Sequence, residues 1–441
     1  MHTFQELQSG ALKGISKLKL SCGLKFFPEE IFTLDDTLEV LDLSGNHLSK
    51  LPDDLWRLKK LRILFLEGNE FTVFPAILSL CEALTMVGLK FNKIDNIPEN
   101  AFPPNLRWLV LTNNKITKLP ASIGSCTLLQ KCALAGNQIE TLPPEMANCI
   151  NLELLRISAN KLTQLPEWLF ALPRLSWLAF GGNPCSYSID LSEDLDEIEW
   201  TEFEVQELLG EGASGFISRA QWVSKAKDVA VKVFKGAVTS DGLPQDEMNA
   251  CVAAGLHENL VATLGRIVRH PEQKQALVFE LIPSHYRNLG GPPSLITCTR
   301  DVFTADTIFS LQEVLQISTA IASVCAHLHE RGILHGDLYA HNVLIDAQAN
   351  ALLGDFGAAS FYDRNNPSLA MAIEKIEVRA FGCLLEDLLK HLPADTLNKE
   401  VVLQYHALKN NCMQEKVGNR PLFKDIFKRL RIFATQFHSL C

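Results

Sequence analysis

The first half of the chain repeats itself, and this periodicity restricts its fold more than any other feature of the sequence. Related nine-residue segments follow one another from LEVLDLSGN to LSWLAFGGN. Their closing asparagines are 22 or 23 residues apart and lie at Asn46, Asn69, Asn92, Asn114, Asn137, Asn160 and Asn183. A proline follows six residues after most of them, at Pro52, Pro75, Pro98, Pro120, Pro143 and Pro166. A repeat of this length predicts a solenoid, in which each coil packs on its neighbours.

Within each segment, apolar residues alternate as a short strand requires, with Leu41 and Leu43 on the inward side. An asparagine buried at the turn can bond backbone groups that a curved coil leaves unpaired. These features resemble leucine-rich repeat proteins of the LP-containing type over residues 15–188. The resemblance implies an α/β solenoid lined by parallel strands. Gly23 replaces the ladder asparagine in the first segment, as in an atypical repeat that caps the solenoid.

The outward strand positions need not be apolar for folding, yet many of them are. We expect them to form a concave surface that binds a protein partner, because aromatic residues, methionine and arginine are enriched in protein interfaces. The alternative is that the linker or a second domain covers some of these side chains. The residues assigned to this surface are Phe65, Met86, Phe91, Trp108 and Trp177.

The repeat ends after Asn183, and residues 190–204 contain eight acidic residues and no basic one. Such a stretch predicts a solvated boundary, with binding to basic residues of the repeat face as the weaker alternative. We therefore expect a repeat domain over residues 1–188, with repeats from about 15. An acidic linker and the start of the next strand occupy 189–204, and a second domain covers 200–441.

Composition and charge exclude several other classes of function. A formal net charge of −10 argues against general binding to nucleic acid. The first residues lack the pattern of a secretory leader, and no run of about 18 apolar residues could span a bilayer. The 12 cysteines form no CxxC pair, which predicts free thiols in a reducing compartment. We expect a soluble cytoplasmic protein.

The second half begins with a glycine-rich turn. Gly210, Gly212 and Gly215 form a GxGxxG motif, which alone is weak because the same spacing opens a Rossmann unit. A Rossmann unit continues with a helix, whereas here the strand DVAVKVF follows and carries Lys232. A lysine in an apolar strand is costly unless it is paired. The next helix offers Glu247 as the partner, with Asp246 as a rival.

Further along, ILHGDLYAHNVLID and GDFG supply Asp337, Asn342 and Asp355. The order and spacing of these elements resemble protein kinases of the eukaryotic type over residues 200–435. The resemblance implies an α+β bilobal domain that binds ATP and Mg. Lys232 and Glu247 would hold the α- and β-phosphates, and Asn342 and Asp355 the Mg ion. Asp337 would orient the acceptor hydroxyl and take its proton.

The same resemblance assigns the surroundings of the nucleotide. Ile217 and Ala230 would cover adenine, and the backbones of Glu280 and Ile282 would meet its edge. A central helix would place Glu377 where kinases usually keep an aspartate that braces the catalytic loop. The full expected set is Gly210, Glu211, Gly212, Ala213, Ser214, Gly215, Ile217, Ala230, Lys232, Glu247, Glu280 and Ile282.

The chain departs from the kinase pattern in three places. Gly336 replaces the arginine that reads a phosphate on the activation loop. Tyr339 stands where serine/threonine kinases keep a lysine, and His341 could supply the missing charge or make a structural hydrogen bond. Only 22 residues separate Asp355 from Glu377, and no APE triad lies between them. Arg420 resembles the arginine that pairs with that triad; Glu374 and Glu377 are possible substitutes for its partner, which stays open.

Taken together, these features favour a protein kinase, of serine/threonine type by default, with a repeat module that binds a partner or substrate. The HGDLYAHN loop resembles that of bacterial proteins that join repeats to a kinase. Two alternatives stay open at this point. One is a pseudokinase scaffold, and the other is a kinase that phosphorylates a small-molecule hydroxyl, since a short activation segment also resembles aminoglycoside and choline kinases.

Overall fold

The computed structural model describes residues 2–187, 196–212, 214–235, 238–239, 241–396 and 400–440, with side chains to 435. The chain divides into two compact units. Met1–Leu175 and Asn183–Cys185 form the first unit, whereas Ser176–Gly182 and Ser186–Cys441 form the second. The second unit therefore includes a short segment that the sequence repeat places in the solenoid.

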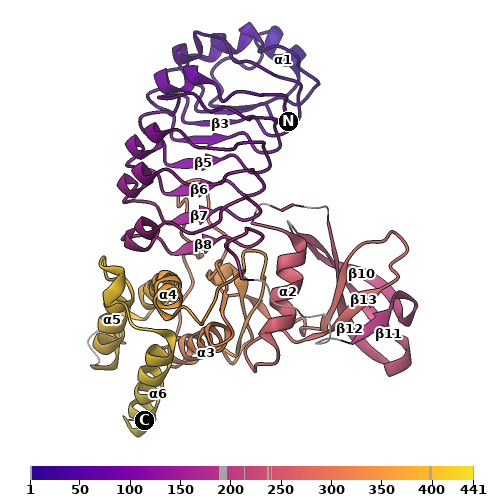
Figure 1. The fold of residues 1–441 in the computed structure, drawn as a ribbon, viewed down its shortest axis with the longest axis vertical. Helices are drawn as coiled ribbons and strands as arrows, with labels where there is room; N and C mark the ends of the chain where they lie inside the picture. Colours follow the sequence, from indigo (N-terminus) through magenta and orange to yellow (C-terminus); the bar gives the residue numbers. More distant parts are fainter. Residues whose placement is uncertain are drawn as a thin grey trace. The chain divides into compact units, whose positions relative to one another are not determined.

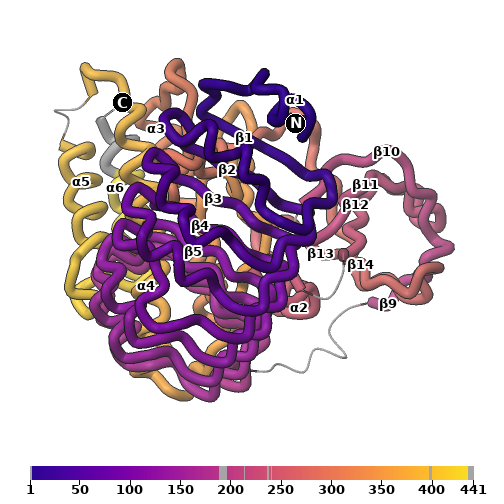
Figure 2. The backbone as a smooth tube through the Cα atoms, turned by 90° about the horizontal axis from the view of Figure 1, so that it is seen from above, coloured from indigo at the N-terminus to yellow at the C-terminus, as the bar shows by residue number. Residues whose placement is uncertain are grey.

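The first unit is a series of stacked coils, which run from the top downward in Figure 1, each contributing one short strand to a parallel sheet (Figures 1 and 2). Each strand pairs with the next in chain order. The strands are β1 (Lys17–Lys19), β2 (Val40–Asp42), β3 (Ile63–Phe65), β4 (Met86–Gly88), β5 (Trp108–Val110), β6 (Lys131–Ala133) and β7 (Leu154–Arg156). This arrangement confirms the predicted solenoid.

Short 3₁₀ helices complete the coils, because the proline at each repeat starts a tight turn rather than a long helix. They are η1 (Glu29–Leu34), η2 (Leu55–Arg57), η3 (Ala76–Leu80), η4 (Ala121–Ser125), η5 (Pro144–Asn148) and η6 (Glu167–Ala171). Helix α1 (Phe4–Gln8) precedes the first coil and begins with a capping box between Thr3 and Glu6.

The repeat asparagines form the predicted ladder and are all buried. Asn114 shows the pattern: its Nδ2 donates to the carbonyl oxygens of Leu89 and Leu111, each at 3.0 Å. Its Oδ1 accepts the backbone N–H of Ile94 at 3.0 Å. One side chain thus satisfies backbone groups of two neighbouring coils, which would otherwise be buried without partners.

The predicted partner surface is only partly available. Phe91 is 41% exposed, and Phe65 and Trp108 are half-buried. Met86 is 3% exposed, so its assignment to an accessible surface was wrong; it lies in register between Ile63 and Trp108, whose side chains flank it. Trp177 is 1% exposed and was also wrongly assigned, because it packs inside the second unit.

The second unit begins with a twisted six-stranded sheet in the order β10-β11-β12-β14-β13-β9. All pairs are antiparallel except β13 with β9. The strands are β9 (Glu197–Glu199), β10 (Phe203–Glu211), β11 (Gly215–Trp222), β12 (Lys227–Phe234), β13 (Thr263–Val268) and β14 (Ala276–Glu280), with η7 (Trp200–Glu202), η8 (Val223–Lys225) and helix α2 (Pro244–Ala254). Phe203, Trp222, Val231 and Ile267 belong to its hydrophobic core.

The acidic stretch before this sheet lies only partly within the described residues. Asp190, Glu193 and Asp194 lie outside them. Glu197 pairs with Arg266, and Glu199 lies 3.1 Å from Arg269. These acidic residues therefore bind basic residues of the second unit.

A larger helical lobe follows in the second unit (Figure 1). Its helices are α3 (Leu311–His329), α4 (Pro367–Lys390), α5 (Glu400–Cys412) and α6 (Phe423–Leu440), with η9 (Ala340–Asn342), η10 (Ala394–Thr396) and η11 (Val417–Asn419). Short strands complete it: β15 (Arg287–Asn288), β16 (Ile333–Leu334), β17 (Val343–Ile345), β18 (Ala351–Leu353) and β19 (Ser360–Phe361). Strand β8 (Trp177–Ala179) is the last strand of the repeat series and lies in the 176–182 segment of this unit. Helix α3 begins with the predicted capping box of Ser310 and Glu313.

Two predictions from composition can be compared with the structure. Cysteines in the described part of the chain are free thiols, as predicted, and all but Cys22 and Cys185 are buried. In that same part, none of the helices combines the length and apolar character needed to cross a bilayer.

Candidate active site

The glycine-rich turn connects β10 and β11 as an antiparallel hairpin, in which the N–H of Gly212 donates to the carbonyl of Gly215 at 2.9 Å. A Cβ at Gly215 would lie 2.6 Å from the carbonyl oxygen of Val233, so packing against β12 requires glycine there. A Cβ at Gly210 or Gly212 would meet no atom within 4 Å. The polypeptide leaves open space at these two positions, as a loop that receives phosphate groups would.

Lys232 and Glu247 form a buried ion pair between β12 and α2. The structure selects Glu247 over Asp246, and the two side chains of the pair are 11% and 3% exposed. Burial alone would lower the pKa of Lys232, but the carboxylates of Glu247 and Asp355 raise it above its ordinary value. The ammonium group therefore stays protonated, facing two carboxylates.

Asp246 lies on the same helix in different surroundings. Its Oδ2 is buried and makes no hydrogen bond to any described residue. Burial raises the pKa of Asp246 to about 6. A Cβ added at Gly181 would lie 3.3 Å from this oxygen, so the carboxyl faces the 176–182 segment rather than Lys232.

A cavity of about 460 Å³ lies between the sheet and the helical lobe of this unit. Its wall includes nine of the residues predicted to surround a nucleotide: Gly212, Ser214, Gly215, Ile217, Ala230, Lys232, Glu247, Glu280 and Ile282. Asp355 also lines it, as does Phe279. Gly210 and Glu211 are not part of its lining, and Glu211 pairs with Lys235 instead. Ala213 lies outside the described residues.

Hydrogen bonds order the catalytic loop internally and connect it to the GDFG segment. Nδ2 of Asn342 donates to Oδ2 of Asp337 at 2.8 Å and to its carbonyl oxygen at 2.9 Å. The Gly354 N–H donates to the carbonyl of Asn342 at 3.1 Å, which places Asp355 next to the loop. Because the described hydrogen bonds of the Asn342 side chain use its nitrogen, its Oδ1 is the atom that can face a cation.

His335 forms hydrogen bonds with both of these segments. It is fully buried, and its Nε2 donates to the carbonyl oxygen of Gly354 at 2.9 Å. Its Nδ1 accepts the N–H of Asp337 at 3.3 Å. These two bonds define the neutral tautomer with its proton on Nε2 and fix the backbone on both sides of the loop.

Glu377 braces the catalytic loop, as the resemblance implied. This fully buried side chain on α4 accepts the Gly336 N–H at 2.6 Å and a hydrogen bond from Nε2 of His329 at 2.7 Å. Although burial disfavours ionisation, the hydrogen bond and charge of His329 hold the pKa of Glu377 below its ordinary value. A longer carboxylate thus spans the distance between α4 and the loop.

Asp301 anchors the other side of the loop and was missed by sequence reasoning. Its carboxylate accepts the Ala340 N–H at 2.5 Å and lies 2.7 Å from Nδ1 of His341. Burial disfavours a charged His341 ring, but Asp301 raises the pKa of His341 above its ordinary value. Asp301 stands 40 residues before His341 in no recognisable motif, so only the fold reveals the pair.

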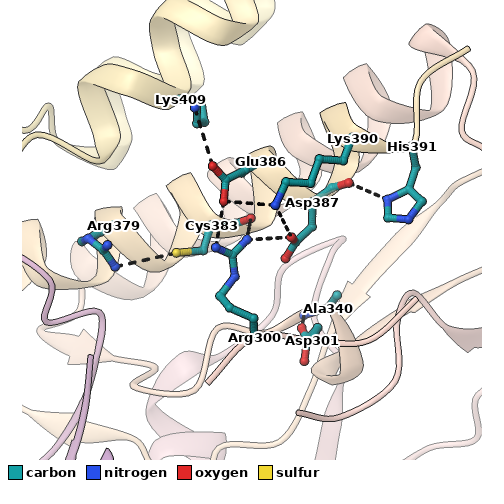
Figure 3. Close-up of polar contacts among 10 residues, drawn as sticks. All are labelled: Arg300, Asp301, Ala340, Arg379, Cys383, Glu386, Asp387, Lys390, His391 and Lys409. Atoms are coloured by element: carbon teal, nitrogen blue, oxygen red, sulfur yellow. Dashed lines mark hydrogen bonds and ion pairs between the residues drawn. The ribbon is translucent and has the colours of Figure 1, made fainter. Parts of the chain in front are cut away.

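The neighbouring Arg300 forms ion pairs and a hydrogen bond with residues of α4, and these contacts hold Asp301 in place (Figure 3). Its guanidinium lies 2.8 Å from Glu386 and 2.6 Å from Asp387, and it also donates to the carbonyl oxygen of Cys383. Burial alone would lower the pKa of Arg300, but these acidic neighbours raise it. The charged cluster fixes the backbone at 300–301 beneath the catalytic loop.

The structure supplies partners for Arg420, which the sequence left open. Arg420 is buried, and its described hydrogen bonds go to the carbonyl oxygens of Gln414 at 2.9 Å and Lys375 at 3.0 Å. Glu377 is engaged with the catalytic loop, and Glu374 accepts the Tyr362 hydroxyl at 3.0 Å. Burial therefore lowers the pKa of Arg420 to about 10.

Comparison with known proteins identifies both units. Residues 203–377 match the model of the protein kinase domain, and residues 13–71 and 82–139 match the leucine rich repeat model. The second unit contains a protein kinase domain. The repeats of the first unit are leucine-rich repeats, so the chain joins the two modules.

The matched relatives are serine/threonine kinases and receptor kinases. A probable serine/threonine-protein kinase of Dictyostelium discoideum is 29% identical over 40% of this chain and 10% of its own length. A putative serine/threonine-protein kinase/receptor of Acanthamoeba polyphaga mimivirus is 28% identical over 39% and 10%. An L-type lectin-domain containing receptor kinase of Arabidopsis thaliana is 26% identical over 42% and 28%. The chain thus spans about a tenth to a quarter of the length of these relatives.

A solved leucine-rich repeat protein of Leptospira interrogans is also similar. The identity is 26%, the TM-score 0.37, and the match covers 42% of this chain and 53% of that one. At that TM-score the likeness adds nothing to the repeat assignment.

Proposed function

We propose that the protein is an ATP- and Mg-dependent protein kinase of serine/threonine type. The observation that carries the proposal is the buried Lys232–Glu247 pair at the wall of a cavity that also contains Asp355. Glu247 holds the Lys232 ammonium at the cavity wall, where the ammonium can donate hydrogen bonds to the oxygens of a bound polyphosphate.

The residues fit a nucleotide and a magnesium ion. The open space at Gly210 and Gly212 can receive phosphates, and the apolar side chains of Ile217 and Ala230 can cover a planar base. Asp355 and Oδ1 of Asn342 are the hard oxygen donors that Mg prefers. No group of three acidic, histidine or cysteine residues among the described residues could hold a metal alone, which suits an ion that also needs phosphate oxygens.

The chemistry assigned to the protein is mainly orientation and charge neutralisation. Bound Mg would supply positive charge across the phosphates. Lys232 would bind the α- and β-phosphates, and Asp337 would orient the acceptor hydroxyl and accept its proton on a carboxylate oxygen. Asn342 holds Asp337 by the 2.8 Å bond from Nδ2. His335 and Glu377 keep the loop backbone in place below.

The decisive test is phosphate transfer from radiolabelled ATP by wild type and Asp337→Asn. We expect the variant to lose at least about 100-fold in rate, because it lacks the proton acceptor but keeps the shape of the side chain. Nucleotide binding should be retained within about threefold, since Asp337 is not part of the cavity wall. Equal rates for the two proteins would favour the pseudokinase scaffold.

A kinase for a small-molecule hydroxyl is the second candidate, favoured by one observation. Only residues 358–366 separate the GDFG segment from helix α4, so little chain is present to dock a peptide. The same assay separates the two classes. Label incorporated into protein supports a protein acceptor, whereas ATP consumption without labelled protein supports a small one.

We further propose that the leucine-rich repeats bind a protein partner or substrate. The accessible members of the predicted surface are Phe91, Phe65 and Trp108, and the Trp108 ring is covered on one side by the Lys131 ammonium at 4.4 Å. A partner identified by crosslinking should bind Phe91→Ala/Trp108→Ala at least about 10-fold more weakly. The free thiols of the described cysteines suit a reducing, cytoplasmic location.

A further inference from the structure

The kinase domain contains a segment from outside its usual boundaries. Ser176–Gly182 has the sequence of a seventh repeat strand, yet it belongs to the second unit. Residues 357–366 form a short link that pairs through β19 with β16 before α4 begins. The segment 176–182 packs against this link and against the catalytic loop.

Hydrogen bonds from its backbone N–H groups to a serine side chain fix the segment to the short link. The hydroxyl oxygen of Ser360, which is fully buried, accepts the N–H groups of Phe180 at 2.8 Å and Gly181 at 3.0 Å. At the other end, Arg379 of α4 donates to the Ser176 hydroxyl at 2.7 Å. The segment is therefore held at both ends by residues that follow Asp355.

Trp177 lies between these two anchors and covers the catalytic loop. Its indole Nε1 donates to the carbonyl oxygen of Leu338 at 3.0 Å. Its ring stacks on that of Tyr339 with centroids 4.3 Å apart and an interplanar angle of 7°. Leu338 and Tyr339 directly follow Asp337, so the contacts act on the backbone that carries the proton acceptor.

Gly336 and Tyr339, the two catalytic-loop residues that depart from the kinase pattern, both lie against this segment. Gly336 has φ +75°, and a Cβ there would lie 2.6 Å from the carbonyl oxygens of both Leu178 and Ala358. An arginine at this position would displace the segment. Tyr339 offers Trp177 a flat ring where a lysine would not. One packing partner thus accounts for Gly336 and Tyr339 together.

We propose that Trp177 is a positioning residue of this kinase domain, which holds the catalytic loop in place of the missing part of the activation segment. The expected effect of Trp177 on catalysis rests on the proposed kinase activity, whereas the contacts of Trp177 with the loop do not. Removing the indole takes one hydrogen-bond donor from the Leu338 carbonyl and the stacked ring from Tyr339, so the backbone next to Asp337 is held less firmly while the nucleotide cavity keeps its walls.

The experiment compares the full-length wild type with Trp177→Ala and Trp177→Phe. With Mg·ATP as the probe, Trp177→Ala should lower the turnover number about 10- to 100-fold and change the KM for ATP less than about threefold. Trp177→Phe keeps a stacking ring without the indole N–H, and it should recover part of the loss. Hydrogen exchange of the amides at 336–342 should be at least about 10-fold faster in Trp177→Ala.

Trp56→Ala is the matched control, because Trp56 is 47% exposed in the repeats. It should leave both measurements at wild-type values. Trp177→Ala with wild-type turnover, or with wild-type exchange at 336–342, overturns the proposal. A wild type that transfers no phosphate, while exchange still separates Trp177→Ala from Trp56→Ala, contradicts the proposed kinase function and supports the placement of the loop by Trp177.

Discussion

Asp246 and Glu247 are neighbours in sequence, yet the fold gives their carboxyl groups different surroundings. Glu247 faces Lys232 in an ion pair, whereas Asp246 has no hydrogen-bond partner among the described residues for its Oδ2. The two residues are one helix position apart, which is a rotation of about 100°. This rotation places Glu247 in a charge pair and Asp246 where ionisation of its carboxyl group opposes folding. The sequence offered both as partners for Lys232, and helix orientation decided between them.

The raised pKa of Asp246 predicts a pH-dependent stability. Its pKa of about 6 lies above the ordinary 3.8, so its contribution to stability is full below about pH 4 and lost as pH rises through 6. Asp246→Asn should therefore be more stable than wild type at pH 8, by on the order of 2 kcal/mol, and similar at pH 4. Urea unfolding at several pH values measures the difference.

Glu258→Gln provides the control for this prediction, since Glu258 is an exposed carboxyl in the loop after α2. Its difference from wild type should stay within about 0.5 kcal/mol at both pH 4 and pH 8, as for most surface substitutions. A constant difference for Asp246→Asn over the same range would show that the carboxyl is already hydrated in the folded protein.

At the scale of elements, the site depends on how β12, α2 and the catalytic loop are held against one another. Lys232 and Glu247 connect strand to helix, and Glu377 connects α4 to the loop. Asp301 and Trp177 hold the loop from two further elements. Each connection joins residues far apart in sequence, so the elements share one geometry only after the domain has folded.

The buried ion pair predicts a non-additive stability effect. Lys232→Met leaves the Glu247 charge without its partner, and Glu247→Leu does the same to Lys232, so each should cost about 3–5 kcal/mol. Lys232→Met/Glu247→Leu should cost much less than the sum, because no buried charge remains. Denaturant unfolding of the four proteins gives the coupling energy. Additive costs would contradict the buried pair, and we expect phosphate transfer to be lost in all three variants.

For the whole molecule, the division into units differs from the division of the sequence. The repeat continues through Asn183, but the residues just before it, Ser176–Gly182, belong to the kinase unit. Removing residues 1–188 would therefore also remove Trp177 and could not isolate the role of the repeats. Point variants on the repeat surface test partner binding without this complication.

The separate cores predict separate responses to destabilisation. Asn114→Ala leaves the Leu89 and Leu111 carbonyls and the Ile94 N–H without this buried partner, at a cost on the order of 3 kcal/mol. Hydrogen exchange should accelerate in β4 to β6 and stay unchanged in β12 and α2. Asn105→Ala removes an exposed hydrogen bond and should cost less than about 1 kcal/mol. Equal acceleration in both units would contradict the prediction.

Local patterns identified much of this protein from its sequence. The phase of Asn46 to Asn183 predicts the ladder and the parallel strands, because every coil repeats the same local contacts. The glycine-rich turn, Lys232, Asp337, Asn342 and Asp355 predict the kinase domain, since its chemistry needs those groups at fixed spacing. Burial of Met86 escaped prediction, because neighbouring side chains decide whether an outward position is exposed. Burial of Trp177 inside the second unit agrees with the alternative that a second domain covers some outward side chains.

The sequence alone determined which modules are present and predicted which residues would carry the chemistry, because repeats and motifs are set by neighbours along the chain. Tertiary structure decided which carboxylate meets Lys232, what Arg420 bonds, and how Asp301 and Trp177 hold the catalytic loop. Those contacts join residues 6 to 161 positions apart. No local pattern records them, since they exist only where packing brings separate elements within bonding distance.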